Sequence, residues 1–325
     1  MKSKGLIKAG LLFLVVGLVV LVGWMEQVQA RAFEQDSDVT RGALLYDNWY
    51  AALGVQPPQG NMPIWDRQTT NTRSGAETWR CVSCHGWDYQ GKDGAYREGS
   101  DRYTGFPGVF PAVTQSTEED IVAVLSGKKD PQHDFSPYLS ESDLKALAHF
   151  LKTALINDNE YIDPKTFKVL GGDSTSGKAL YEAQCARCHG EDGTTLRFRF
   201  EGRDATLGTL AQLDPWRFLH KTRFGTPGTE MVIGYELGWT AQQGRDVLLY
   251  AQSLPSGMEV QQSPSLGEAT PAPAAQPGGP ARNVLTGVLT AFGALFTGLG
   301  FALVLGVFLI GVIFVIVWVI RGKKQ

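Results

Sequence analysis

Two stretches decide how this chain folds: RCVSCHGWDY, from Arg80 to Tyr89, and QCARCHGEDG, from Gln184 to Gly193. Each stretch contains the pattern Cys-x-x-Cys-His. The four cysteines of the chain all lie in these two motifs: Cys81, Cys84, Cys185 and Cys188. No cysteine remains for a structural disulfide, so the role of all four cysteines must follow from a motif that occurs twice.

The chemistry of the motif points to haem. A Cys-x-x-Cys pair alone fits a redox pair or half of a zinc site. A histidine directly after the second cysteine is typical of c-type haem attachment. The two thiols bond to the two vinyl groups of one porphyrin, and the next residue places an imidazole under the iron. Two motifs without a spare cysteine disfavour zinc and predict two covalently bound haem c groups.

The distribution of charge excludes one class of partner. Six of the 30 basic residues lie near the chain ends: Lys2, Lys4, Lys8, Arg321, Lys323 and Lys324. Residues 31–283 therefore hold 24 basic and 32 acidic side chains, a net charge of −8. Nucleic-acid binding needs clustered cations, so it is disfavoured. A redox protein that presents basic residues is the better partner.

The N-terminal segment, residues 1–30, has a basic start and then an uncharged apolar run of 16 residues, Ala9 to Trp24. The sequence Val28-Gln29-Ala30 resembles a cleavage site. The segment therefore predicts either a signal peptide or an uncleaved N-terminal membrane anchor. Both alternatives export the residues that follow.

The C-terminal segment, residues 256–325, predicts a membrane attachment. Residues 256–283 are rich in proline and fit a tether. Residues 284–320 carry no charge and predict a transmembrane helix, which the basic tail 321–325 would follow in the cytoplasm. A strip of small residues on this helix suggests an integral-membrane complex: Ala294, Gly298, Ala302 and Gly306. The haem domains are then expected on the periplasmic face of the cell membrane.

Between the ends, two units repeat one order of features. A glycine and a tyrosine four positions later precede each motif: Gly42 and Tyr46 precede the first, and Gly177 and Tyr181 precede the second. An amphipathic pattern closes each unit. These features resemble class I c-type cytochromes. The resemblance implies an all-α fold of two tandem cytochrome c domains, residues 36–156 and 173–255, joined by a linker at 157–172 and followed by the transmembrane helix.

The resemblance also implies the iron ligands. The proximal ligands would be His85 and His189. In the second unit, Met231 stands on a Gly/Pro-rich loop where the family places its distal methionine. His220, in a probable helix, is the alternative.

The first unit departs from the family pattern, because no methionine lies between Cys81 and Met231. His133 stands where a methionine is expected, which predicts bis-histidine ligation. The alternatives are His149, in the closing helix, and Met62, in an inserted loop. Since Met/His ligation raises the potential relative to His/His, the sequence predicts a low-potential first haem and a higher-potential second haem.

The leading functional prediction is a membrane-tethered carrier that relays electrons from a membrane-bound donor to a terminal acceptor in a respiratory chain, without acid, base or nucleophile. One alternative is a dihaem redox enzyme such as a thiosulfate dehydrogenase or a peroxidase. Another is a cytochrome subunit of a larger respiratory complex. The sequence identifies neither donor nor acceptor.

Overall fold

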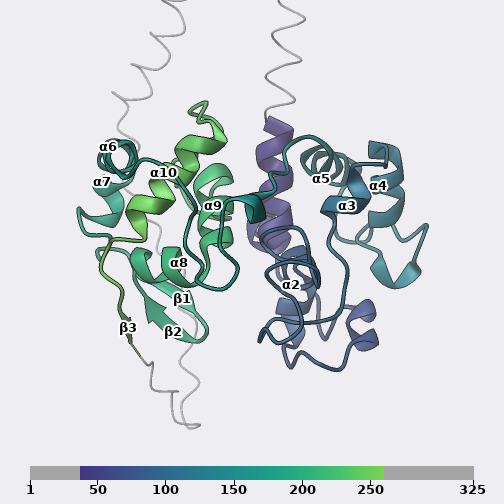
Figure 1. Cartoon of the computed structure of the whole chain (residues 1–325). Coiled ribbons are helices and arrows are strands. Elements are labelled where there is room, and N and C mark those ends of the chain that lie inside the picture. The colour runs from purple at the N-terminus through teal and green to yellow at the C-terminus, as the bar shows by residue number, and fades with distance from the viewer. Residues whose placement is uncertain (1–36, 260–325) are drawn as a thin grey trace, which may run out of the picture. The chain divides into compact units, whose positions relative to one another are not determined.

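The computed structural model describes residues 37–259, and residues 1–36 and 260–325 lie outside the described part of the chain (Figure 1). The described residues all belong to one compact unit. We call residues 37–156 the first half and residues 173–259 the second half.

The first half begins with the first helix, residues 37–53. Eight short elements follow up to and including the linker: the 3-10 helices η1 (Pro63–Arg67), η2 (Gly75–Trp79), η3 (Pro131–His133) and η4 (Asp158–Glu160), and the α-helices α2 (Cys81–His85), α3 (Phe110–Val113), α4 (Glu118–Leu125) and α5 (Glu141–Thr153).

The second half starts with the helices α6 (Ser174–Gln184) and α7 (Ala186–His189), which contains the second motif histidine. Strands and helices then follow in this order: β1 (Phe198–Phe200), β2 (Arg203–Ala205), α8 (Leu207–Leu213), α9 (Pro215–Phe224), α10 (Ala241–Ala251) and β3 (Met258–Glu259).

A glycine lets two helices approach closely in each half. A Cβ atom added to Gly42 would lie 2.2 Å from the carbonyl oxygen of Ala146 in α5. A Cβ added to Gly177 in α6 would lie 1.9 Å from the carbonyl oxygen of Asp246 in α10. Both distances are far inside van der Waals contact, so only glycine fits either position. The first helix and α5 thus pair as α6 and α10 do.

The helices that close the two halves begin at capping boxes. Ser140 accepts a hydrogen bond from the backbone N–H of Asp143, whose carboxylate accepts the N–H of Ser140. Thr240 and Gln243 form the same reciprocal pair at the start of α10. Each box satisfies backbone donors that a helix start leaves free, and it fixes where the buried apolar face of the helix begins.

The expectation of an all-α fold is wrong. The second half contains a three-stranded antiparallel sheet in the order β1-β2-β3 (Figure 1). Phe198 pairs with Ala205, and Ala205 also pairs with Met258. The strands are too short for a period-two pattern to be recognised in the sequence. Pairing with β2 also places Met258–Glu259 in the fold, although the sequence assigns them to the tether.

The predicted membrane attachment receives no support either. None of the helices within residues 37–259 is both long and apolar enough to cross a bilayer. The 13 residues of α5, for example, would reach about 20 Å, whereas the hydrocarbon core is about 30 Å thick. The segments 1–30 and 284–320, and the tail 321–325, lie outside the described residues. The predictions of a cytoplasmic C-terminal tail and of haem domains on the periplasmic face of a membrane are therefore not supported.

Candidate haem sites

The first motif forms a single helical turn, α2, in the first half. Cys84 is buried, and Cys81 and His85 are partly buried. Gly86 follows with a φ of 78°, a left-handed conformation that glycine adopts without strain. The carbonyl oxygen of Gly86 accepts a hydrogen bond of 2.6 Å from the hydroxyl of Tyr46 on the first helix. The first helix thereby fixes the end of the motif.

The structure brings the rings of His85 and His133 together in an edge-to-face arrangement. Their ring centroids lie 6.2 Å apart, and their planes are inclined by 73°. A bond from an imidazole nitrogen to a metal is about 2.0–2.1 Å long, and the ring centre lies about 1.1 Å behind the nitrogen, so imidazoles on opposite sides of one metal have centroids about 6.3 Å apart. The observed separation matches the space that a single metal ion requires between two histidines.

Backbone carbonyls orient the two imidazoles. Nδ1 of His85 lies 2.7 Å from the carbonyl oxygen of Pro107, and Nδ1 of His133 makes a longer contact of 3.5 Å with that of Val124. When Nδ1 carries the proton for such a bond, Nε2 is free to bind a metal. Burial lowers the pKa of His85 to about 4, and the neighbouring His133 contributes. Burial also lowers the pKa of His133. Both rings are therefore neutral at pH 7, which is the form that binds metals.

A cavity joins the first motif to His133. Residues from the insertion, the motif and the later loops line it: Met62, Ile64, Thr78, Arg80, Cys81, Cys84, His85, Phe106, His133 and Phe135. The lining is largely apolar, and its donor set comprises two thiols and two imidazoles. Those are the groups that haem c needs for covalent attachment and axial ligation, so the residues fit a haem at this position.

The two alternatives to His133 have different surroundings. Met62 is 3% exposed and lines the cavity, where its backbone N–H donates to the hydroxyl of Thr78 over 2.9 Å. His149 lies on α5, and its Nδ1 is 2.9 Å from a carboxylate oxygen of Glu118. Met62 is therefore close to the first motif, whereas His149 ties α5 to α4.

The second motif repeats the local geometry of the first. Gly190 follows His189 with a φ of 82°, and its carbonyl oxygen accepts a 2.6 Å hydrogen bond from the hydroxyl of Tyr181 on α6. Tyr181 thus does in the second half what Tyr46 does in the first. The equal spacing of glycine and tyrosine in the sequence reflects this shared packing.

His189 and Met231 have different surroundings. His189 is 7% exposed, its ring lies 5.7 Å from that of Phe198, and its Nδ1 has no hydrogen-bond partner within residues 37–259. Met231 lies on the loop between α9 and α10, with its sulfur 3.8 Å from the hydroxyl of Thr226. Buried polar side-chain atoms in proteins nearly always have a hydrogen-bond partner, so Nδ1 of His189 is an exception that calls for an explanation.

His220 lies in an aromatic cluster between the two halves. It is 1% exposed, and its Nδ1 is 2.7 Å from the hydroxyl of Tyr89 in the first half. Rings from both halves surround it: Tyr46, Trp87, Tyr89, Phe150 and Phe224. Burial lowers its pKa to about 3. The contact with the first half could not be read from the sequence, because the four rings that the first half contributes lie 70 or more positions away from His220.

The four cysteines form no disulfide. Burial raises the pKa of Cys81 and of Cys84 to about 12 and that of Cys185 to about 11, whereas Cys188 is exposed. No cluster of three or more His, Cys, Asp or Glu side chains suited to a metal ion occurs within residues 37–259. Cys81, Cys84 and Cys185 are thus neutral thiols at pH 7, each beside its motif histidine.

Comparison with known proteins gives two family matches, one around each motif. Residues 73–155 match the family described as cytochrome c, and residues 172–231 match the cbb3-type cytochrome c oxidase subunit III family. The chain is also 30% identical over 107 residues to a gluconate 2-dehydrogenase cytochrome c subunit of Pantoea cypripedii. That alignment covers 31% of this chain and only 24% of the relative.

No solved structure matches the chain significantly. The two family matches, the relative and the repeated Cys-x-x-Cys-His motif agree with one another. The region around each motif is therefore similar to c-type cytochromes, the proteins in which a Cys-x-x-Cys-His motif attaches haem c.

Proposed function

We propose that the chain carries two haem c groups and relays single electrons between a redox donor and an acceptor. Cys81 and Cys84 would attach one haem, and Cys185 and Cys188 the other. The haems would belong to two domains, residues 36–156 and 173–255, with 157–172 as linker. The edge-to-face imidazoles of His85 and His133, beside two cysteines in one cavity, carry the proposal.

At the first site, His85 and His133 would be the axial ligands. The carbonyl of Pro107 holds the His85 ring, and apolar side chains such as Phe106 and Phe135 would exclude water from the haem. Bound haem supplies an iron that accepts and releases one electron. A fixed pair of ligands limits how far the site must rearrange when the charge changes, and it leaves no open position for a substrate.

At the second site, we infer His189 and Met231 as axial ligands. Imidazole stabilises ferric iron more than a thioether does, so Met/His ligation raises the potential relative to His/His. Electrons would then run from the first haem to the second. Met231 would supply the second ligand from the glycine-rich loop between α9 and α10.

A second candidate is a role as the cytochrome subunit of a dehydrogenase complex. The relative with 30% identity is itself the cytochrome c subunit of a gluconate 2-dehydrogenase. In that case the donor would be a dehydrogenase subunit that docks permanently. Purification under gentle conditions followed by sizing separates the two candidates, because a carrier migrates alone and a subunit migrates with its partner.

The primary test is to count haem groups. The chain is produced with a functional cytochrome c maturation system, and haem per chain is measured by pyridine haemochrome absorbance. We expect two haems in the unmodified protein and one in the double variant Cys185→Ala/Cys188→Ala. A single haem in the unmodified protein would contradict the proposal. Magnetic circular dichroism in the near infrared then identifies the ligand pair at each iron.

A further inference from the structure

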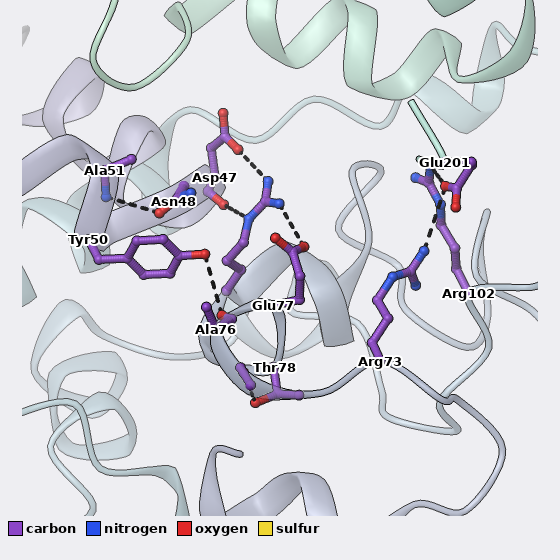
Figure 2. Close-up of polar contacts among 12 residues, drawn as sticks. Asp47, Asn48, Tyr50, Ala51, Arg73, Ala76, Glu77, Thr78, Arg102 and Glu201 are labelled. Atoms are coloured by element: carbon purple, nitrogen blue, oxygen red, sulfur yellow. Dashed lines mark hydrogen bonds and ion pairs between the residues drawn. The ribbon is translucent and has the colours of Figure 1, made fainter. Parts of the chain in front are cut away.

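Helix α9 joins the second half to the first through charged side chains at several positions. Asp214, which caps α9, accepts from Arg102 over 2.6 Å, and Arg102 also binds Glu201 at 2.7 Å. Figure 2 shows Arg73 and Arg102 of the first half directed toward this same Glu201. In the middle of the helix, Lys221 pairs with the buried carboxylate of Asp47. These contacts define one face of α9 as the contact surface for the first half.

The end of α9 is tied to the linker. Arg223 donates two hydrogen bonds to the carboxylate of Asp158, at 2.5 and 2.7 Å, and both side chains are buried. A bidentate pair of this kind fixes orientation as well as distance. The position of α9 is therefore set against the first half at its start and middle, and against the linker at its end.

His220 occupies the centre of this surface. Its ring lies 5.1 Å from that of Trp87, and its Nδ1 shares a 2.7 Å hydrogen bond with Tyr89. Trp87 is the second residue after His85. The guanidinium carbon of Arg217 and the ammonium nitrogen of Lys221 lie over its ring, 5.8 and 5.3 Å from the ring centroid. Trp87 thus connects the first motif to α9: it lies two residues after His85 in the chain, and its ring contacts that of His220.

The last turn of α9 holds the loop of the second site. The carbonyl of Thr222 accepts from the N–H of Gly234 over 2.8 Å, and that of Arg223 accepts from Tyr235 over 3.0 Å. Met231 lies on this loop. One helix therefore touches the segment beside the proximal histidine of the first site and carries the loop of the candidate distal ligand of the second.

We propose that His220 is a positioning residue for electron transfer between the two haem sites. It fixes α9 to Trp87 and Tyr89, and so it sets the distance and the packed route between the irons. This inference rests on the proposed function, since it requires two haems. Transfer moves one electron from one iron to the other and breaks no bond. His220 and Tyr89 keep their protons and are not oxidised.

Three variants test the proposal in the holoprotein. His220→Gln removes the ring but keeps a polar side chain that can bond to Tyr89. Tyr89→Phe keeps the ring packing and removes the hydrogen bond. Lys145→Gln is the control, because Lys145 lies on α5 with its side chain 64% exposed. Haem content, both midpoint potentials and the rate of electron transfer between the haems after flash reduction are measured for each.

We expect His220→Gln to retain two haems with potentials close to those of the unmodified protein. Its internal transfer should slow, since loss of the ring loosens the packing of α9 on Trp87 and lengthens the route between the two haem sites. Tyr89→Phe should slow it less, and Lys145→Gln should leave it unchanged. A merely structural role would lower stability without changing the rate in the folded holoprotein.

An unchanged rate in His220→Gln with two haems bound overturns the positioning role and leaves the proposed function intact. If His220→Gln does not yield holoprotein, Tyr89→Phe decides: a slower rate at unchanged potentials supports the role, and an unchanged rate refutes it. If the unmodified protein binds fewer than two haems, the proposed function itself fails, and the haem count distinguishes this outcome from the others.

Discussion

The imidazole rings of His85 and His133 lie edge to face with centroids 6.2 Å apart, although the two residues are 48 positions apart in the sequence. The carbonyl of Pro107 orients the first ring at 2.7 Å. This pair makes the first haem site the better defined of the two, and it yields the first prediction.

Replacing His133 with methionine should change the ligation of the first haem. Because a thioether donates less to ferric iron than imidazole does, the potential of that haem should rise. Potentiometric titration and near-infrared magnetic circular dichroism measure both effects. The control is His149→Gln, since His149 bonds to Glu118 on α4. If the first haem keeps its spectrum and potential in His133→Met, another residue is the ligand, and Met62 becomes the next to replace.

The tyrosines that bond to the motif glycines should contribute equally to the two halves. Tyr46→Phe removes the 2.6 Å hydrogen bond to Gly86, and Tyr181→Phe removes the one to Gly190. Each loss should lower the free energy of unfolding by about 1–3 kcal/mol, because a carbonyl is left without its donor. Denaturant titration of the holoprotein measures the change. If the free energy of unfolding changes in only one of the two variants, the two tyrosines do not contribute equally to stability.

The glycines at the helix crossings should not tolerate a methyl group. Gly177→Ala would place Cβ 1.9 Å from the carbonyl oxygen of Asp246, and relief of that clash should cost about 1–3 kcal/mol or more. Gly244→Ala is the matched control in α10, since its nearest neighbours lie at 3.8 Å. That variant should gain about 0.5–1 kcal/mol from helix propensity. Thermal unfolding compares the two. Equal melting temperatures would refute the close crossing.

The buried carboxylate of Asp47 should make stability depend on acid pH. Burial alone would raise its pKa, but Lys221 and Arg80 outweigh burial and hold the pKa below the ordinary value of 3.8. The folded state therefore gains stability above about pH 4, and this gain is lost as the pH falls through the lowered pKa. The free energy of unfolding, measured at intervals of about one pH unit from pH 6 downward, should show this loss.

Asp47→Asn should remove that part of the pH dependence. At neutral pH it should also lower the free energy of unfolding by about 3–5 kcal/mol, because Arg80 and Lys221 lose a shared buried partner. Asp130→Asn is the control: Asp130 pairs with Arg67 near the surface, and exposed ion pairs contribute little. If both variants follow the same pH curve as the unmodified protein, Asp47 is not the group responsible.

The sequence by itself determined the chemistry of this protein. Two Cys-x-x-Cys-His motifs predict covalent haem attachment from local spacing alone, and the repeated spacing of glycine and tyrosine indicates two similar units. The capping box of Ser140 and Asp143 at the start of α5 is likewise a local feature, because it lies within four residues. All of these signals are short in range, so the residue order contains them completely.

Tertiary structure decided everything that depends on distant partners. The short sheet of β1, β2 and β3 forms because residues 258–259 return to pair with β2, which no local pattern encodes. The sequence could rank His133 as a candidate ligand but could not place it opposite His85. Likewise, His220 looked like a helix residue near the second haem, and only packing joined it to Tyr89 and Trp87. Burial and ring contacts are set by which surfaces meet when the chain folds, and a linear sequence does not state which ones do.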